Sequence, residues 1–212
     1  QLMCNCVIKN EVLFCKMDSF AGDGDFGMSI AKGFSQLKRE WKYLLSSSCE
    51  DIGQFLMGCS FIITEYCGGA SGPIWGSAFR AAYLNVGKKK VLNLKEFAEM
   101  LQAAVAGVQR TGEKSFGRGA VVGDKTLIDA LVPCADTLLE CANKKTSVRD
   151  ALHAGADAAV LGAESTSKLV ARMGRAGVVG ERSLGHPDAG AYALGVIFTE
   201  IAGSMNYSPE EK

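Results

Sequence analysis

The sequence predicts an all-α protein made of antiparallel helices. Long stretches are rich in Ala, Leu, Met, Lys and Glu, and their apolar residues recur at intervals of three and four positions, the period of an amphipathic helix. Hydrophobic residues make up 48% of the 212 residues, which is enough to bury a sizeable core. No alternation of period two outlasts these patterns. Short glycine-rich breaks separate the helical stretches, so successive helices are expected to turn back on one another as a bundle or barrel.

Eight helices are expected along the chain. Asn93 is a candidate N-cap, and Asp188 opens the last helix. Ser147, with Asp150 three residues later, resembles a capping box. Because the sequence contains no linker, low-complexity tract or internal repeat, residues 1–212 are expected to form a single domain. The expected helices span residues 2–16, 27–45, 50–67, 72–86, 94–110, 125–142, 147–173 and 188–204.

Charge and composition argue against several classes of partner. Lys and Arg together number 23, as do Asp and Glu, so no long-range field favours nucleic acid or an anionic membrane. The sequence contains no run of about 18 uncharged apolar residues, so no membrane span is expected. The start at Gln1 lacks an initiator Met and a basic segment, so we expect a trimmed or processed chain rather than a signal peptide.

The cysteines are expected to be reduced, buried thiols of a cytoplasmic protein. They form no C-x-x-C pair, and the two histidines lie far from any close pair of cysteines, which argues against a zinc site. The eight are Cys4, Cys6, Cys15, Cys49, Cys59, Cys67, Cys134 and Cys141.

An acidic, glycine-rich segment is the first candidate site. Asp18, Asp23 and Asp25 lie within eight positions, and carboxylates this close repel one another unless cations or hydrogen-bond donors hold them. Converging carboxylate oxygens suit Mg²⁺ or Ca²⁺. An EF-hand is excluded because position 12, counted from Asp23, is Phe34 rather than Glu. The structural alternative is that Asp25 caps the following helix while Asp18 and Asp23 are solvated turn residues.

Three further glycine-rich segments separate predicted helices. Residues 68–73 lead into an apolar helix whose N-terminal amides can bind a phosphate, although a tight helix–helix turn explains them equally well. Residues 123–129 open another helix, with Asp124 as a candidate N-cap. The last segment covers residues 174–190. In it, Arg175 can pair with a phosphate in bidentate fashion, and His186 is either an acid–base group or a hydrogen-bonded scaffold residue.

Taken in order, the four segments resemble the nucleotide-binding subunit, or C-terminal domain, of dihydroxyacetone kinases. The pattern of that family runs LD-x-x-x-G-D-[GA]-D-H-G, GGASGP, GDKTM-x-D and GRA-x-x-x-GERS-x-GH-x-DPGA. Residues 17–27, 68–73, 123–129 and 174–191 follow it over most of the chain. The sequence departs from the family at several positions, since Phe26 replaces a His, Leu127 replaces a Met, and Val122 and Ala189 each replace a Pro.

The resemblance implies a barrel of eight antiparallel amphipathic helices with the nucleotide site at one end. It implies that Asp18, Asp23 and Asp25 bind two Mg²⁺ ions that bridge the phosphates of ADP or ATP, with no other catalytic residue on this chain. The residues implied to bind the nucleotide are Gly27, Gly69, Ala70, Ser71, Thr126, Leu127, Arg175, Asp188, Ala189 and Gly190.

The implied reaction is phosphoryl transfer to dihydroxyacetone that is bound on a separate subunit or domain. The chain is therefore expected to be a cytoplasmic kinase subunit that is active only with a dihydroxyacetone-binding partner. The phosphoryl donor is left open between ATP and a phosphocarrier protein that acts on bound ADP, and a homodimer is also left open. Phe26 motivates the alternative, a divergent non-catalytic relative that binds nucleotide as an interaction or regulatory module.

Overall fold

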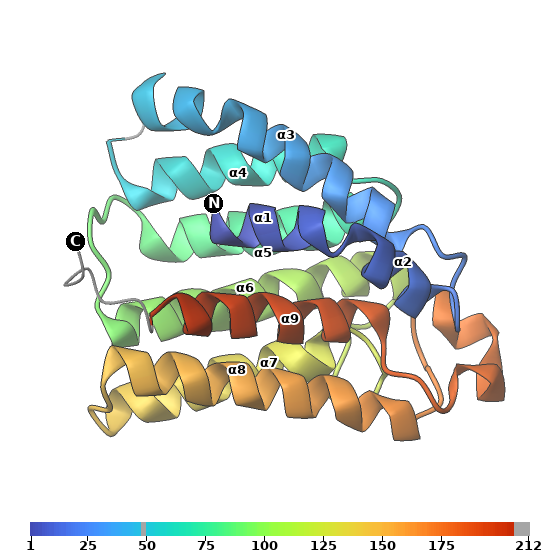
Figure 1. Ribbon diagram of the computed structural model, residues 1–212. Coiled ribbons are helices and arrows are strands. Elements are labelled where there is room, and N and C mark those ends of the chain that lie inside the picture. The colour runs from blue at the N-terminus through green and yellow to red at the C-terminus, as the bar shows by residue number, and fades with distance from the viewer. Residues whose placement is uncertain (48–49, 206–212) are drawn as a thin grey trace.

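The chain folds into a closed ring of helices that run alternately in opposite directions (Figure 1). The structure is a computed structural model that describes residues 1–47 and 50–205. Its α-helices are α1 (Leu2–Lys9), α2 (Glu11–Asp18), α3 (Phe26–Ser47), α4 (Ile52–Tyr66), α5 (Ser71–Val86), α6 (Leu94–Phe116), α7 (Ile128–Asn143), α8 (Val148–Ser165) and α9 (Ala189–Ser204). Each helix from α3 to α9 packs against the next, and α1 and α2 close the ring by packing against both α3 and α9.

The all-α prediction is confirmed, since no strand occurs in the part of the chain that the structure describes. The single helix expected over residues 2–16 is wrong, because the chain breaks at Asn10. The side-chain amide of Asn10 donates a hydrogen bond to the carbonyl oxygen of Cys6 (2.9 Å), and its backbone amide donates to the same oxygen (3.1 Å). These bonds end α1, and α2 begins at Glu11. The described residues therefore form nine α-helices, of which α1 and α2 share one place in the ring.

Three other predicted helix boundaries differ from those in the structure. The helix expected over 147–173 ends at Ser165, where the hydroxyl of the next residue, Thr166, donates to the carbonyl of Ala163 (2.5 Å). The helix expected over 94–110 continues to Phe116. The helix expected over 125–142 begins only at Ile128, because Lys125 has a φ of 61°, outside the helical region.

The predicted start signals at Asn93, Ser147 and Asp188 are confirmed. The Asn93 carboxamide oxygen accepts from the Glu96 amide (3.0 Å) while the Glu96 carboxylate accepts from the Asn93 amide (2.9 Å), which is a complete capping box. The Ser147 hydroxyl accepts from the Asp150 amide (3.1 Å). These bonds satisfy amide donors that a helix start leaves unpaired.

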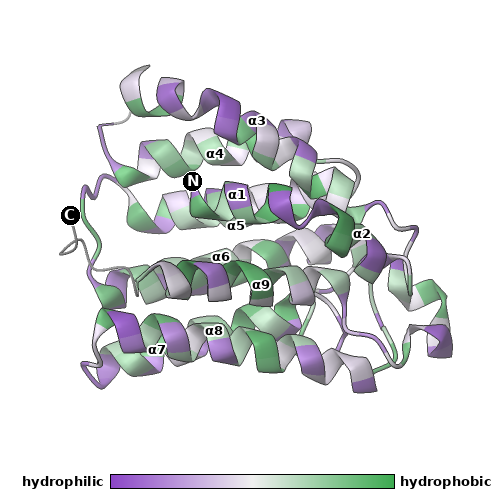
Figure 2. Cartoon of the chain, viewed as in Figure 1, coloured by the Kyte–Doolittle hydropathy of each residue, from purple (hydrophilic) through white to green (hydrophobic). Residues whose placement is uncertain are grey.

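Apolar side chains fill the inside of the ring. The largest fully buried ones come from helices on all sides of it, among them Phe14, Phe34, Ile63, Ile128 and Ile197. Figure 2 shows hydrophilic and hydrophobic residues alternating along α3 and α8, as expected for amphipathic helices that form a wall. Among the described residues, no helix is long and apolar enough to cross a membrane.

The cysteines are mostly buried, as predicted. Burial raises the pKa of the Cys67 thiol to about 11 and that of Cys134 to about 12, so both stay protonated and unreactive near neutral pH. Cys15 and Cys141 are only partly buried, and Cys49 lies outside the described residues. The buried thiols are those of Cys4, Cys6, Cys59, Cys67 and Cys134.

The capping box of α6 allows a direct test of helix stability. Asn93→Ala should lower the free energy of unfolding by about 1 kcal/mol and the melting temperature by roughly 2–4 °C, because the first turn of α6 loses its acceptor. Thermal unfolding followed by circular dichroism measures the change. Asn5→Ala, at an exposed position of α1, is the matched control and should leave stability unchanged or slightly higher. Equal effects of the two substitutions would contradict the capping role.

Candidate functional site

All four glycine-rich connections lie at one end of the ring. Residues 19–25, 67–70, 117–127 and 166–188 join helices at the end that is on the right in Figure 1. The last of these contains three short 3₁₀ helices, Thr166–Lys168, Arg175–Val178 and Gly180–Ser183. An open cavity of about 200 Å³ lies among the four connections. Its walls are Met17, Asp18, Ala21, Gly22, Asp23, Asp25, Phe26, Ser29, Gly68, Ala70, Ser71, Ile74, Trp75, Lys125, Thr126, Leu127, Met173, Gly174, Arg175, Ala176, Pro187, Asp188, Ala189 and Gly190.

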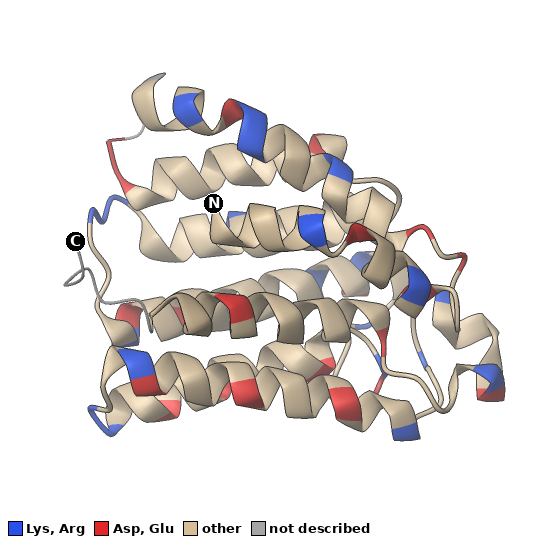
Figure 3. Cartoon of the chain, in the orientation of Figure 1, with Lys and Arg blue, Asp and Glu red and all other residues tan. Residues whose placement is uncertain are grey.

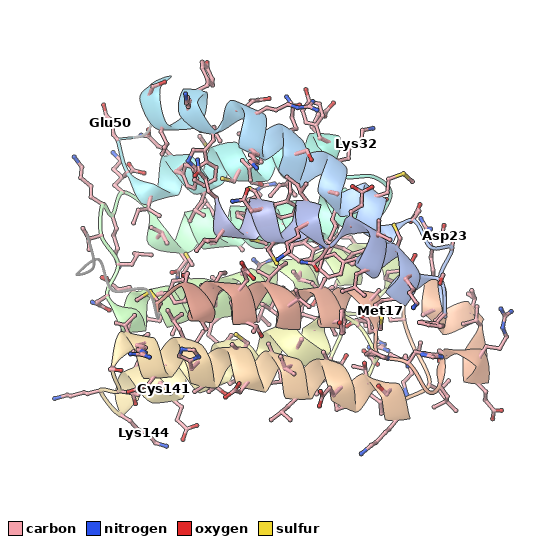
Figure 4. The ribbon with its side chains drawn as sticks, in the orientation of Figure 1. Met17, Asp23, Lys32, Glu50, Cys141 and Lys144 are labelled. Atoms are coloured by element: carbon pink, nitrogen blue, oxygen red, sulfur yellow. The ribbon has the colours of Figure 1, made fainter. Side chains whose placement is uncertain are left out.

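The three aspartates of the acidic segment converge on one wall of this cavity. One carboxylate oxygen from each of Asp18, Asp23 and Asp25 lies within 4.8 Å of the other two. Asp18 ends α2, and its Oδ2 accepts from the Gly24 amide (2.8 Å), which folds the loop back over the helix end. A Cβ at Gly22 would lie 2.2 Å from the Asp18 Oδ1, so the loop can pass this carboxylate only without a side chain there. Figure 4 shows Asp23 on this loop.

The donor set fits a hard divalent cation. Three carboxylate oxygens can act as ligands to one cation or to two neighbouring cations, and partial exposure of all three side chains leaves room for further oxygen ligands. The structural alternative, with Asp25 capping α3 by its side chain, lacks support, because the Met28 amide in the first turn of α3 donates to the Cys15 Sγ (3.3 Å).

Arg175, which follows Asp23 by 152 residues in the sequence, places its positive charge beside the aspartates. Its guanidinium contacts the carboxylate of Asp23, and its Nη1 lies 3.5 Å from the Asp25 Oδ1. A Cβ at Gly69 would lie 3.2 Å from its Nη2, so Arg175 also lies against the 67–70 connection. Figure 3 shows basic and acidic residues close together on the connections at this end. A negatively charged group that bridges cations at the aspartates would thus meet a bidentate donor as well.

The start of α5 forms a second wall. Ala70 and Ser71 line the cavity, and the Gly68 amide donates to the carbonyl of Ser29 (3.2 Å), which holds this connection against the first turn of α3. The positive dipole end of this 16-residue helix favours an anion at this position, and the Ser71 hydroxyl adds a donor there, whereas the Ser71 amide is paired with the Gly68 carbonyl (3.2 Å) and Pro73 has no N–H.

The predicted N-cap role of Asp124 is wrong. The Asp124 carboxylate is buried and accepts two hydrogen bonds from the Arg118 guanidinium, at 2.5 and 2.9 Å. The Arg118 guanidinium lowers the pKa of Asp124 below its usual range. Asp129, in the first turn of α7, instead binds the turn that precedes the helix, since its carboxylate accepts from the amides of Gly123 (2.6 Å) and Thr126 (2.8 Å). These bonds shape the turn that presents Thr126 to the cavity.

Lys125, in the same turn, is 2% exposed. Its ammonium donates to the carbonyl oxygens of Thr166 (2.8 Å), Ser183 (2.5 Å) and His186 (2.7 Å). Burial lowers the pKa of Lys125, and the neighbouring carboxylates of Asp188 and Asp129 oppose that effect.

The third wall is the start of α9. The Asp188 carboxylate accepts from the Ala191 amide (2.8 Å), and the Asp188 amide donates to the Thr166 hydroxyl (2.8 Å). Burial raises the pKa of Asp188 to about 7, against the lowering effect of the Ala191 hydrogen bond. Two residues earlier, the His186 ring stacks on the Phe20 ring with centroids 3.6 Å apart, so it joins the acidic loop to this connection.

The cavity brings together most of the residues predicted from the sequence. Gly27 and Gly69 do not line it. A Cβ at Gly27 would lie 2.0 Å from the carbonyl oxygen of Glu11, so this glycine lets α3 approach α2 closely. The predicted residues on the cavity walls are Asp18, Asp23, Asp25, Ala70, Ser71, Thr126, Leu127, Arg175, Asp188, Ala189 and Gly190.

Several other residues of the walls had no role predicted from the sequence. Ile74 and Trp75 belong to an apolar helix, and helical periodicity cannot distinguish a cavity wall from ordinary core. Lys125 could have been noticed from the sequence, because it lies between Asp124 and Thr126 in a segment singled out for its motif.

Comparison with known proteins identifies the family of the chain. A family model for the DAK2 domain matches residues 20–203. The chain belongs to the DAK2 domain family. This DAK2 domain is 36% identical, over 187 residues, to the ADP-binding subunit DhaL of PEP-dependent dihydroxyacetone kinase 2 from Listeria innocua, covering 87% of this chain and 82% of that one. The corresponding DhaL subunit of PEP-dependent dihydroxyacetone kinase from Escherichia coli is 35% identical, covering 84% of this chain and 80% of that one.

Solved structures agree with the assignment. The dihydroxyacetone kinase of C. freundii in its native form superposes on the DAK2 domain with a TM-score of 0.73 and 27% identity, over 96% of this chain. The same kinase in complex with AMP-PNP and Mg²⁺ has a TM-score of 0.71 and 26% identity. The DAK2 domain spans 33% of the native kinase chain, which is thus about three times as long as the matched region. The resemblance identified from the four motifs is confirmed.

The Asp124–Arg118 pair predicts how stability depends on pH. Because the pKa of Asp124 is lower in the folded chain than in the unfolded one, its ionised form stabilises the fold at neutral pH, and this contribution is lost as the pH falls through the acidic range. Asp124→Asn should therefore lower the melting temperature by a similar amount near about pH 7 and about pH 5, and progressively less as the pH falls below about 3.8, the ordinary pKa of an Asp carboxyl. Asp157→Asn, at an exposed position of α8, should change none of these values. A loss that stays constant to about pH 2 would contradict an ionic role for Asp124.

Proposed function

We propose that this DAK2 domain is the nucleotide-binding subunit or domain of a kinase for dihydroxyacetone or a closely similar short ketose. The observation that carries the proposal is the convergence of Asp18, Asp23 and Asp25 in one cavity with the start of α5 and with Arg175. The names of the relatives support it, since two of them are ADP-binding subunits of dihydroxyacetone kinases and a solved neighbour is a complex with AMP-PNP and Mg²⁺.

In this proposal Asp18, Asp23 and Asp25 would hold two Mg²⁺ ions, which would supply charge neutralisation for the phosphates of ADP or ATP. The positive end of α5 and the Ser71 hydroxyl lie where they can bind phosphate oxygens, and the Arg175 guanidinium, now in contact with Asp23, can also donate to a phosphate oxygen. The chain thereby positions the nucleotide and balances its charge, which is the main contribution that a protein makes to phosphoryl transfer.

The remaining walls are assigned to the nucleoside. Thr126 and Leu127 lie on one side of the cavity, and the start of α9, from Asp188 to Gly190, lies on the other. The apolar side chain of Leu127 suits a purine face, and Asp188 can accept a hydrogen bond from a hydroxyl or amino group. Gly27 and Gly69 act indirectly, Gly27 by letting α3 approach α2 and Gly69 by leaving space for the Arg175 guanidinium.

The acceptor is proposed to come from a dihydroxyacetone-binding partner, as the subunit names of the relatives indicate. An L-erythrulose kinase from Pectobacterium atrosepticum, 30% identical over 94% of this chain, extends the acceptor class to four-carbon ketoses. The donor is either ATP or a phosphocarrier protein. A cytoplasmic location is part of the proposal, since buried thiols are typical of a reducing compartment.

The metal role is tested by Asp23→Asn. Isothermal titration of the parent chain with ADP should show binding that requires Mg²⁺, and Asp23→Asn should weaken it by roughly tenfold or more, because one charged ligand is lost. Asp157→Asn should bind like the parent. Binding without Mg²⁺, or an Asp23→Asn chain that matches the parent, would refute the magnesium site.

A second candidate function is a non-catalytic nucleotide-binding module. The observation that favours it is Phe26, which lines the cavity beside the aspartates and packs against Phe14, with ring centroids 6.3 Å apart. An apolar ring in this position cannot donate a hydrogen bond to a phosphate.

Reconstitution separates the two functions. We predict that the chain alone forms no dihydroxyacetone phosphate, and that it does so when a dihydroxyacetone-binding subunit is added with ATP or with a phosphocarrier donor. Release of ADP, measured in the same reaction, distinguishes the donors, because an ATP-dependent enzyme exchanges its nucleotide and a phosphocarrier-dependent one retains it. A chain that binds ADP but forms no product under any of these conditions would support the non-catalytic module.

A further inference from the structure

The base of the cavity contains a lysine in an unusual setting. Lys125 is 2% exposed, and its φ of 61° is in the left-handed region, which a side chain other than glycine or asparagine seldom adopts. Burying an ammonium and holding its backbone in this region both cost free energy, so compensating contacts must hold the residue in place.

The cost of burying the Lys125 ammonium is offset by hydrogen bonds from all three of its donors. An ammonium has three N–H donors, and those of Lys125 go to the carbonyl oxygens of Thr166, Ser183 and His186 at 2.5–2.8 Å. Because all three donors are used, Lys125 has none left for a phosphate, although it lines the cavity. Three carbonyl oxygens that converge in this way form a cation site, and the lysine supplies its cation through its own side chain.

The three carbonyls come from the two ends of one long connection. Thr166 begins the segment between α8 and α9, whereas Ser183 and His186 lie near its end. The same segment carries Arg175 and leads directly into Asp188, while Lys125 is followed by Thr126 and Leu127. The ammonium therefore joins two opposite walls of the cavity.

Few other bonds cross this junction. The Arg172 amide donates to the carbonyl of Asp124 (3.0 Å), and the hydrogen bond from Gly185 to Ser167 (2.9 Å) closes the connection on itself without reaching the 123–127 turn. The three bonds from Lys125 are thus the main polar link between the walls among the described residues.

We infer that Lys125 is a positioning residue of the nucleotide site, whose ammonium acts as a tethered cation that keeps the 166–188 connection in place for nucleotide binding. The inference rests on the proposed function for the identity of the ligand. It assigns to Lys125 no contact with the reacting phosphates.

The test is chemical complementation of Lys125→Ala. This variant lacks three methylene groups and an ammonium, which propylammonium can replace. The variant should bind ADP with Mg²⁺ roughly tenfold or more weakly than the parent, and propylammonium should restore most of the affinity. Tetramethylammonium, which has the same charge and no N–H donor, should restore none. Lys125→Met, which fills the space with an uncharged chain, should stay weak in both salts.

Hydrogen exchange gives a readout that needs no nucleotide. Backbone amides of residues 169–186 should exchange faster in Lys125→Ala and Lys125→Met than in the parent, and propylammonium should slow exchange in Lys125→Ala only. Lys168→Ala, at an exposed position of the same connection, should behave like the parent in both measurements. If Lys125→Ala folds only in propylammonium, that outcome supports the inference, and a chain that stays unfolded in both salts contradicts it.

These readouts separate the two proposals. A parent chain that binds no ADP with Mg²⁺ refutes the proposed function, and exchange alone then decides the role of Lys125. Parent-like affinity and exchange in both variants would overturn the inference. Equal recovery in propylammonium and tetramethylammonium would also overturn it, because recovery would then reflect charge screening rather than hydrogen bonds.

Discussion

The site depends on one constraint, the alternation of helix direction around a closed ring. Because neighbouring helices run in opposite directions, every second connection lies at the same end, and four segments far apart in the sequence meet there (Figure 1). Each brings different chemistry: carboxylates after α2, helix amides at α5, the turn before α7 and the guanidinium of Arg175 before α9. The packing of α1 and α2 against α3 and α9 closes the ring, and it also sets the position of Asp18 at the end of α2.

Charge balance explains how such a site can exist in a chain with no net charge. The three aspartates lie at a partly exposed surface, where water and Arg175 moderate their repulsion. Two of the buried ionic groups beneath them are held in different ways. Asp124 has a bidentate partner in Arg118, whereas the ammonium of Lys125 donates to three backbone carbonyls. The outer pair can exchange partners readily because exposed ion pairs are weak, while the buried groups keep the connections in fixed positions.

This division suits a subunit whose role is to hold a nucleotide. Three elements shape the base of the cavity, namely the turn at residues 123–127, the segment that Lys125 anchors and the cap of α9 at Asp188. Above them, Asp23 and Arg175 are about half exposed and face the opening where a partner and a phosphoryl group would arrive. Phe26 lies between these layers, packed against Phe14 yet part of the cavity wall, so a change of chemistry at this position is compatible with an unchanged fold.

The sequence by itself determined the helical class, three helix starts and the four segments that form the site, because periodicity, capping and motifs act over a few neighbouring residues. Asp18, Asp23 and Asp25 could be named for the same reason, since they share one short loop. Only the structure revealed the break at Asn10, the end of α8 at Ser165 and the partners of Asp124 and Asp129. The first two involve bonds within four residues, to Cys6 and Ala163, at positions where helical periodicity continues, whereas Asp124 is held away from capping by Arg118. The role of Lys125 was the hardest to predict from the sequence. Its three acceptors are 41 to 61 residues away and are backbone carbonyl oxygens, which every residue possesses.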